Sequence, residues 1–572
     1  MKKTFDCIER LFVVALAATL VLSLMVGSPG MAKPAAPSGS YIVQGADVDT
    51  VSRLVEQYGG VVTSRLAIIQ GVGATLPAGA VERLAAHPAV SRIFPNATVR
   101  LVANQAAGGN VPATDYPEVV GADVTLAQGT NGSGISVAVV DTGLGWHPGL
   151  FKDINGKNVH IVGWKDFVEN KIFPHDPNGH GTHVAGIIAN TQKDSSGAYN
   201  GVAPGVKLVG VRVLDETGAG TYERTIQGIQ WVVDHKDSYN IRVMNLSLVS
   251  AVQSPYWADP LNQAVMQAWA AGIVVVAAAG NGGPAPMTIG VPGNNPYVIT
   301  VGAFTDNYTP LDWNDDYLAD FSAAGPTLDG FVKPDLLAPG AHMVSTMMPW
   351  SYLARNHQAN WVTPIYFSMA GTSQATAVTS GVAALVLSHS PNLTPDEVKY
   401  RLMVTAFPWV DPQTTDALYS MWQQGAGRLN AVDAVYADIS GTANYGMDIQ
   451  ADLAGTIHYE GYSYYDETTG EFKLRSPFDT WGGGYGTWSG GYGTWSGGYG
   501  TWSGGYGTWS GGYGTWSGGY GTWSGGYGTW SGSEPWAGTN LFDPAFVTNF
   551  LAGVGPDAAT TTTSIGNWVE EP

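Results

Sequence analysis

The chain has 572 residues, of which 44% are hydrophobic and 13% are charged, a composition typical of a compact globular protein and one that excludes a wholly disordered chain. Its formal net charge of −20 disfavours nucleic acid as a partner, because no basic excess is present to neutralise phosphates. The only cysteine, Cys7, precedes the first apolar run, so disulfides are not expected to stabilise the exported protein.

Residues 1–32 have the three parts of a secretory signal peptide. Basic residues come first, an apolar run covers residues 11–26, and Gly30 and Ala32 form a small-x-small cleavage pattern. A retained membrane anchor is the alternative, since the run approaches the length that spans a bilayer. We expect cleavage, and therefore a secreted, extracellular protein with no membrane contact once the signal is removed.

The core of the next region, residues 40–101, has the pattern of a small independent α+β unit. "YIVQG" predicts a strand, and Val51, Leu54, Val55 and Tyr58 then recur at helical spacing. Strand-like "VVTSRLAIIQGVGATL", a second short helix and "VSRIF" follow. The order β-α-β-β-α-β predicts a ferredoxin-like split motif.

Residues from about 135 to 435 alternate apolar runs with helical segments. The runs "ISVAVVD", "VKLVGVRVL", "VMNLSL" and "IVVVAAAGN" are continuously apolar, which predicts a doubly wound α/β domain with a mostly parallel sheet covered on both faces. Ligands in such folds bind at the carboxyl ends of the strands, where Asp141, Asn245 and Asn281 stand.

Beyond Tyr445 the composition shifts, and "GGYGTWS" repeats with a period of seven. The glycines exclude a coiled coil, and an odd period would turn successive tryptophans of a strand to opposite faces. We expect an extended, flexible low-complexity segment, with an aromatic array that contacts a surface or a glycan as the alternative.

Three segments carry the chemistry. "VAVVDTGLGWHPGL" contains Asp141 at a strand end, "NGHGTHVAG" opens a helix at His180, and "MAGTSQATAV" opens another at Ser373. Each is ordinary by itself, as a turn residue, a helix start or an N-cap. Together they supply the carboxylate, the imidazole and the hydroxyl that hydrolysis of an amide by an activated serine requires. His183 is expected to pack rather than to bind a metal, because no glutamate follows at zincin spacing.

A fourth segment, "VVVAAAGNGGP", supplies donors for a developing negative oxygen. The side-chain amide of Asn281 and the backbone N–H of Ser373 are suitable for this task. The order Asp, His, Ser is that of subtilisin, whereas lipase-type hydrolases use G-x-S-x-G, which "GTSQA" does not match.

With "DTG", "HGTHVAG", "AAAGN" and "GTS" in this order, residues 117–435 resemble the subtilisin-like serine proteases. The resemblance implies that Asp141 orients the imidazole, His180 acts as general base and acid, Ser373 is the nucleophile and Asn281 is the oxyanion donor. It implies a serine endopeptidase that acts on proteins and peptides and requires no cofactor for its chemistry.

The resemblance also implies a substrate cleft in which an extended peptide pairs with backbone on both sides. Gly290 would leave room for a large apolar side chain before the scissile bond, while Val249 stands where the family generally has a glycine and could crowd the bound strand. The residues expected to contact substrate are Gly218, Ala219, Gly220, Ser247, Leu248, Val249, Ala279, Gly280 and Gly290.

These predictions divide the chain into six parts. They are a signal peptide (1–32), an inhibitory pro-peptide with its activation linker (33–116), the catalytic domain (117–440), an aromatic-rich linker (441–480), the heptapeptide repeats (481–532) and a tail (533–572). The resemblance implies that the pro-peptide inhibits its own chain until it is cut off between residues 102 and 116; a permanent accessory domain is the alternative.

Three questions stay open at this stage. "ANTQKDSSGAYNG" resembles the region of a calcium loop, so structural calcium is one expectation and a solvated turn is the other. A non-catalytic cell-surface or adhesion protein built on the same scaffold is an alternative function. An esterase or peptide transferase on this fold is another.

Overall fold

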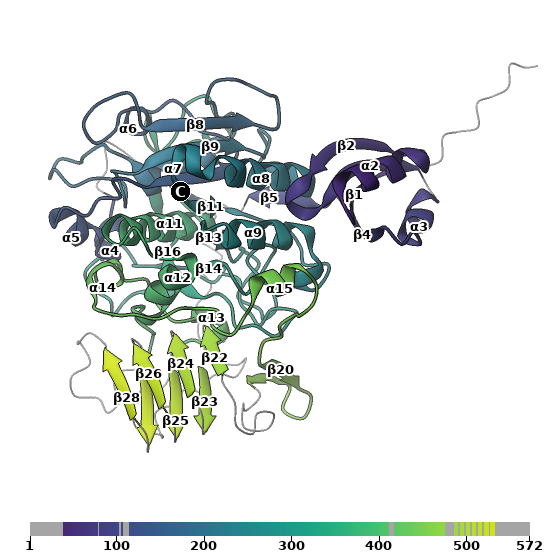
Figure 1. Cartoon of the computed structure of the whole chain (residues 1–572). Coiled ribbons are helices and arrows are strands. Elements are labelled where there is room, and N and C mark those ends of the chain that lie inside the picture. The colour runs from purple at the N-terminus through teal and green to yellow at the C-terminus, as the bar shows by residue number, and fades with distance from the viewer. Residues whose placement is uncertain are drawn as a thin grey trace, which may run out of the picture. The chain divides into compact units, whose positions relative to one another are not determined.

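The computed structural model describes residues 38–77, 79–101, 104–106, 114–410 and 417–474, together with repeat strands between residues 486 and 531 (Figure 1). The chain forms two compact units. The first contains residues up to 65 and residues 72–95, and the second contains residues 66–71 and those from 96 onward. The predicted signal peptide and the tail at 533–572 lie outside the described residues.

The first unit is a four-stranded sheet with two helices. Its elements are β1 (Ser38–Gly45), α2 (Val48–Gln57), β2 (Val61–Leu66), β3 (Gly71–Pro77), α3 (Ala80–Ala85) and β4 (Val90–Pro95). The strand order is β2-β3-β1-β4. Helix α2 begins where the side chain of Asp47 accepts the N–H of Thr50 at 2.7 Å, and it buries Val51, Leu54 and Val55. The elements follow the predicted order β-α-β-β-α-β.

The second unit is built on an eight-stranded sheet with the order β15-β14-β13-β11-β7-β9-β8, in which β16 also pairs with β14. Every pairing is parallel except that of β14 with β15. Strands β7, β13 and β14 are buried along their whole length, which confirms the mostly parallel sheet expected from continuous apolar runs. The strands are β7 (Ser136–Asp141), β8 (Ile161–Asp166), β9 (Lys207–Arg212), β11 (Ile241–Leu246), β13 (Val274–Ala278), β14 (Ile299–Thr305), β15 (Tyr317–Leu318) and β16 (Leu336–Pro339).

Helices pack along this sheet in pairs (Figure 1). Helix α7 (His180–Ala189) contacts α11 (Thr372–His389), and α8 (Tyr222–Tyr239) contacts α9 (Pro260–Ala270). Every residue of α7 is buried, as expected of a helix that is apolar or small all round. In the part of the chain that the structure describes, no helix is both long enough and apolar enough to cross a bilayer.

Two smaller sheets lie next to the elements that carry the predicted site. Strand β5 (Thr98–Leu101) is the middle strand between β10 (Ala219–Thr221) and β12 (Leu248–Val249), antiparallel to both. Strand β6 (Asn104–Ala106) pairs with β19 (Tyr366–Ala370), which ends just before α11 begins.

The repeats form strands, which are extended as predicted, and these strands pair into sheets, which the sequence analysis did not predict. Alternate strands belong to different sheets, one with the order β22-β24-β26-β28 and one with the order β23-β25-β27. Neighbours in a sheet are parallel and 14 residues apart, so identical residues pair, as Trp488 does with Trp502. Two periods of seven make an even number, which gives neighbours in one sheet the same phase. The strands are β22 (Gly486–Ser489), β23 (Tyr492–Ser496), β24 (Tyr499–Ser503), β25 (Tyr506–Ser510), β26 (Tyr513–Ser517), β27 (Tyr520–Ser524) and β28 (Tyr527–Ser531).

Candidate active site

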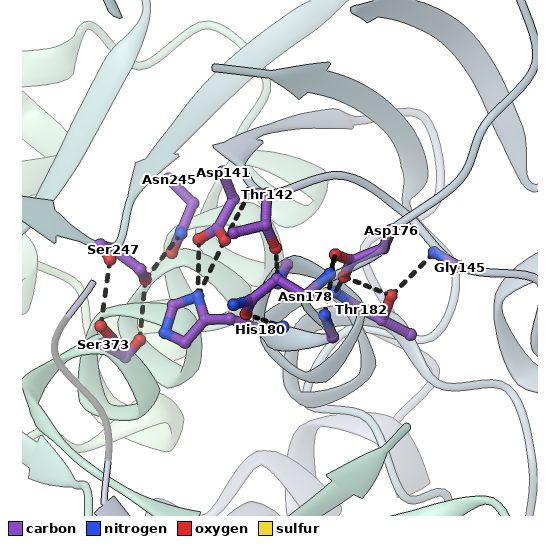
Figure 2. Close-up of polar contacts among 12 residues, drawn as sticks. Asp141, Thr142, Gly145, Asp176, Asn178, His180, Thr182, Asn245, Ser247 and Ser373 are labelled. Carbon is purple, nitrogen blue, oxygen red and sulfur yellow. Dashed lines mark hydrogen bonds and ion pairs between the residues drawn. The ribbon is translucent and has the colours of Figure 1, made fainter. Parts of the chain in front are cut away.

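Three residues that are far apart in the sequence meet at the carboxyl end of the central sheet (Figure 2). Asp141 is the last residue of β7, His180 is the first residue of α7, and Ser373 is the second residue of α11. All three are fully buried. This is the edge of the sheet at which the sequence predicted a ligand site.

The carboxylate of Asp141 is hydrogen-bonded to one edge of the His180 ring. Nδ1 of His180 lies 2.8 Å from Oδ1 and 3.0 Å from Oδ2 of Asp141, and Oδ1 also accepts the N–H of Thr142 at 2.7 Å. This geometry assigns the proton of the neutral imidazole to Nδ1. Nε2 of His180 has no hydrogen-bond partner among the described residues, so its lone pair is available to accept a proton.

The start of α7 is fixed by Asp176, a residue that the sequence analysis did not single out. Its carboxylate accepts the N–H groups of Asn178 at 3.1 Å, of Gly179 at 2.8 Å and of Thr182 at 2.8 Å, and also the Thr182 hydroxyl at 2.7 Å. Gly179, at the N-cap position, has no side chain that could cap the helix. Asp176 therefore does for α7 what an N-cap side chain does elsewhere, and it holds His180 in place.

Helix α7 also approaches β7 closely. The N–H of Gly181 donates to Oγ1 of Thr142 at 2.9 Å. A side-chain carbon at Gly181 would collide with the carbonyl oxygen of Gly143. Glycine directly after His180 therefore allows the imidazole to reach the carboxylate at the end of β7.

Ser373 is held by a network of small polar side chains (Figure 2). Its Oγ donates to the carbonyl oxygen of Ser247 at 3.1 Å, and Oγ of Ser247 donates to the carbonyl oxygen of Ser373 at 2.9 Å. Asn245 donates to Oγ of Ser247 at 2.9 Å and accepts from Ser380 at 3.0 Å. The hydroxyl of Ser373 is therefore bonded to a neighbouring carbonyl and not to His180.

Asn281 is anchored through one end of its amide. Its Oδ1 accepts the N–H of Thr372 at 3.0 Å and the hydroxyl of Thr372 at 2.9 Å. These two bonds leave Nδ2 on the opposite side of the amide group. The N–H of Ser373 lies in the first turn of α11, where backbone donors have no acceptor within the helix. The side chain of Asn281 and the backbone of Ser373 thus each offer one N–H donor at the start of α11.

The predicted substrate-contacting segments surround β5. Backbone pairing joins Ala219 and Val249 to Arg100 from the two sides, and Gly220 to Val99. Leu248 pairs with Leu101. Val249 therefore does not prevent a strand from pairing here. Gly218 lies in the turn just before β10, and Ser247 belongs to the network around Ser373.

The remaining predicted contacts lie beside the start of α11. The N–H of Gly280 donates to the hydroxyl of Thr372 at 3.2 Å. The N–H of Gly290 donates to the carbonyl oxygen of Ala279 at 3.0 Å. Gly280 is therefore bonded to the residue before Ser373, and Gly290 is bonded to the residue before Gly280.

Comparison with known proteins identifies the family. Residues 132–453, more than half of the chain, match the profile of the subtilase family, peptidase family S8. The chain belongs to the subtilase family. It is a serine-type endopeptidase with the subtilisin-like α/β fold.

Two relatives illustrate how far this subtilase matches known proteases. It is 41% identical to the serine protease AprX of Bacillus subtilis (strain 168) over 351 residues, which is 60% of this chain and 74% of AprX. It is 33% identical to subtilisin E of the same organism over 356 residues, 62% of this chain and 80% of that protein.

Among solved structures, the subtilase resembles fervidolysin from Fervidobacterium pennivorans with a TM-score of 0.54 and 24% identity. The match covers 71% of this chain and 62% of the fervidolysin chain. At this level of identity the likeness supports the fold alone.

The second histidine of the "HGTH" motif has a packing role in the subtilase. Nε2 of His183 lies 3.0 Å from the carbonyl oxygens of both Met343 and Phe367. Burial, together with the nearby His180, lowers the pKa of His183 to about 3, so the ring is neutral at physiological pH. These contacts agree with the expectation that His183 packs.

In the segment that resembles a calcium loop, one oxygen of Asp194 accepts hydrogen bonds from its own turn. Asp194 accepts the N–H groups of Ser196 at 2.8 Å and Ala198 at 3.0 Å, and the Ser196 hydroxyl at 2.6 Å. The carboxylate closes its own turn, as the alternative expectation for this segment stated. Calcium in this subtilase stays a prediction.

Among the described residues, two groups of acidic and histidine side chains lie close enough together to share an ion. In the first, the guanidinium of Arg212 lies between Asp166 and Glu169, at 3.2 Å and 2.7 Å. In the second, Nε2 of His342 lies 2.6 Å from Asp306. Burial opposes the charge of His342, but its carboxylate partners raise the pKa to about 9. In both groups a protein side chain supplies the positive charge.

Proposed function

We propose that this subtilase is a secreted endopeptidase, made as an auto-inhibited zymogen, in which Asp141, His180 and Ser373 form a catalytic triad. The observation that carries the proposal is the state of His180. Its Nδ1 is bonded to both oxygens of Asp141, while its Nε2 has no partner among the described residues and the ring lies beside Ser373 (Figure 2).

The proposed reaction proceeds in two halves. Nε2 of His180 takes the hydroxyl proton of Ser373 as Oγ attacks the peptide carbonyl carbon and the carbonyl electron pair moves to its oxygen. The imidazolium then gives this proton to the departing amine nitrogen as the C–N bond breaks, which leaves an ester on Ser373. Water repeats the same steps and releases the acid. Asp141 remains ionised and stabilises the imidazolium.

The developing negative oxygen would be stabilised by two donors, Nδ2 of Asn281 and the N–H of Ser373. Before the attack, Ser373 must exchange its bond to the Ser247 carbonyl for one to His180. We expect a rotation about the Cα–Cβ bond of Ser373 to accomplish this. The Ser247 hydroxyl can hold the backbone of Ser373 meanwhile, because it donates to the carbonyl oxygen of that residue.

We propose that a substrate binds as the strand between β10 and β12. Pairing through the backbone gives affinity with little dependence on the side chains, so broad specificity is expected. The side chain that precedes the scissile bond would enter the space beside Ala279, Gly280 and Gly290, where an apolar group is favoured. Beyond the bond, the peptide would pair with β19.

The zymogen proposal is supported by what pairs with these strands. Strand β5, which follows the first unit in the chain, lies between β10 and β12, and β6 pairs with β19. While they remain there, no other peptide can pair with the same strands. We therefore propose that residues 33–116 are a pro-peptide and linker that inhibit their own chain. The proposed cut falls between Leu101 and Asn104, a stretch that overlaps the start of the expected interval of residues 102 to 116.

The experiment compares residues 33–572 with Ser373 intact and with Ser373→Ala. We expect the intact chain to cut itself between Leu101 and Asn104, to cleave casein and to be labelled by phenylmethylsulfonyl fluoride, as read by intact mass and N-terminal sequencing. The Ser373→Ala chain should remain uncut and unlabelled. Ser388→Ala, on the same helix, is the matched control and should behave like the intact chain. Self-cleavage by the Ser373→Ala chain would contradict the proposal.

The remaining parts of the proposal concern location and accessory contacts. Export rests on the signal-peptide pattern of residues 1–32. The repeats would serve for contact with a surface or a glycan.

An adhesion protein without activity is not favoured, because the chain belongs to a family of proteases. Comparison of ester hydrolysis, peptide hydrolysis and aminolysis distinguishes an endopeptidase from an esterase or a transferase.

A further inference from the structure

We propose that Val249 restricts the side chain before the scissile bond to small and medium aliphatic groups, against the large apolar group that Gly290 alone would favour. The inference rests on the proposed function, because it concerns the primary pocket of the proposed active site. It assigns the size limit of that pocket to one side chain.

Val249 and Gly290 each immediately precede one partner of a short antiparallel bridge between Ser250 and Val291. The N–H of Ser250 donates to the carbonyl oxygen of Val291 at 2.9 Å, and the N–H of Val291 donates back to the carbonyl oxygen of Ser250 at 2.9 Å. These two hydrogen bonds fix the end of β12 against the segment that contains Gly290. Val249 and Gly290 lie diagonally across this bridge, and the side chain of Val249 reaches the Cα of Gly290 from there.

The space next to the Gly290 Cα is already occupied. A carbon added there would lie 3.1 Å from Cβ and 3.4 Å from Cγ1 of Val249, and 3.0 Å from the carbonyl oxygen of Ser250. These separations are shorter than or at the limit of ordinary van der Waals contact between heavy atoms. The valine side chain therefore fills the position into which a residue larger than glycine would project.

The residues around this position include two alanines. Ala279 and Ala323 are buried in one apolar cluster with Ile289, and a carbon added at Gly280 would meet Ala323 at 3.6 Å, which is ordinary contact. Val249, in contrast, is only half-buried. Ile289 is buried inside the cluster, whereas the partly exposed side chain of Val249 stands against Gly290, and in this proposal it sets the depth of the pocket.

The position of Val249 in the strand separates its two effects. Its backbone pairs with Arg100 of β5, so the side chain does not interfere with the binding of an extended peptide. A change at Val249 should therefore alter which side chain is accepted and not whether a strand can bind. Discrimination by the size of an apolar pocket is worth about 10- to 200-fold in kcat/KM.

The test uses the mature enzyme and a series of peptides that differ only before the scissile bond, with Ala, Val, Leu or Phe at that position. We expect the unaltered enzyme to cleave the Ala, Val and Leu peptides better than the Phe peptide. Val249→Gly should raise the ratio of kcat/KM for the Phe peptide to kcat/KM for the Ala peptide by about 10- to 200-fold. The ratio for Val249→Ala should lie between that of the unaltered enzyme and that of Val249→Gly.

Two controls separate the possible failures. Val159→Gly replaces an exposed valine of the same unit, 48% exposed, and should leave the ratio unchanged. If Val249→Gly fails to mature, Val249→Ala and the preference of the unaltered enzyme decide the question. Equal cleavage of Phe and Ala peptides by the unaltered enzyme, or a ratio unchanged in both Val249 variants, overturns the inference while the endopeptidase proposal stands. Absence of cleavage of every peptide and of casein would instead contradict the proposed function.

Discussion

Asn281 combines a structural bond and a proposed catalytic one in a single amide group. Its Oδ1 is bonded twice to Thr372, and this fixes the direction of Nδ2. We expect Asn281→Ala to lower kcat by about 100- to 1,000-fold, the cost known for loss of the corresponding donor in subtilisin, with a small change in KM. Steady-state kinetics on a short peptide measures it.

A second variant separates the two bonds. Asn281→Asp keeps an acceptor for Thr372 but replaces the N–H donor by a second oxygen, so it should lower kcat at least as much as Asn281→Ala. Unfolding in urea should show that Asn281→Asp retains stability. Turnover unchanged in both variants would remove Asn281 from the mechanism.

At the scale of single residues, the sequence predicted more of the composition of the site than of its bonding. Asp141, His180, Ser373 and Asn281 could be named because amide hydrolysis needs these chemical types and they stand in a known order. The bond from Ser373 to Ser247 could not be predicted, because it depends on a side-chain rotation. The contact between Val249 and Gly290 depends on a bridge between segments about 40 residues apart.

At the scale of elements, helix α7 depends on Asp176. We expect Asp176→Ala to lower the free energy of unfolding by about 1–3 kcal/mol, because three N–H groups and a hydroxyl lose their buried acceptor. The expected loss should appear in urea unfolding of the Ser373→Ala chain, in which self-digestion is prevented. In the active chain, kcat should fall as well, since His180 begins this helix.

Asp194→Ala is the matched control for Asp176→Ala. Asp194 also accepts several bonds from its own turn, but that turn is exposed, so the loss should stay within about 0.5 kcal/mol. Equal destabilisation by the two substitutions would show that Asp176 has no special role at the start of α7.

The central strands were predictable because continuous apolar runs are typical of parallel strands covered on both faces. Strand β5 was not. Thr98 and Arg100 are exposed and polar, and its pairing joins it to β10 and β12, which are more than 100 residues away in the chain. Such a strand is specified by its partners rather than by its own residues. The pairing of the repeats was missed for a similar reason, because it joins every second repeat.

At the scale of the whole molecule, stability cannot depend on disulfides, because the only cysteine is Cys7. It depends instead on a buried interior that includes neutral histidines. Burial lowers the pKa of His147 and of His160 to about 4, and that of His183 to about 3. Protonation of these rings should therefore destabilise the second unit.

The pH dependence follows from the direction of these shifts. In the unfolded chain a histidine binds its proton near pH 6.5, whereas in the folded chain these three bind it only near pH 3 to 4. Between these values the unfolded state binds more protons, so the free energy of unfolding should fall as the pH falls from about 6.5 towards 4. Each histidine should contribute about 1.4 kcal/mol per pH unit at most.

His160→Leu tests this account most directly, because neither of its ring nitrogens has a hydrogen-bond partner among the described residues. In His160→Leu, made in the Ser373→Ala chain, the free energy of unfolding in urea should fall less steeply between pH 7 and 4.5, by the contribution of about one bound proton. At pH 7 the variant should lose little stability. His147→Leu should reduce the slope equally but also cost stability at pH 7, because Nδ1 of His147 accepts the N–H of Gly149 at 3.1 Å. An unchanged slope in both variants would mean that the acid sensitivity arises from the carboxylates, and not from buried imidazoles.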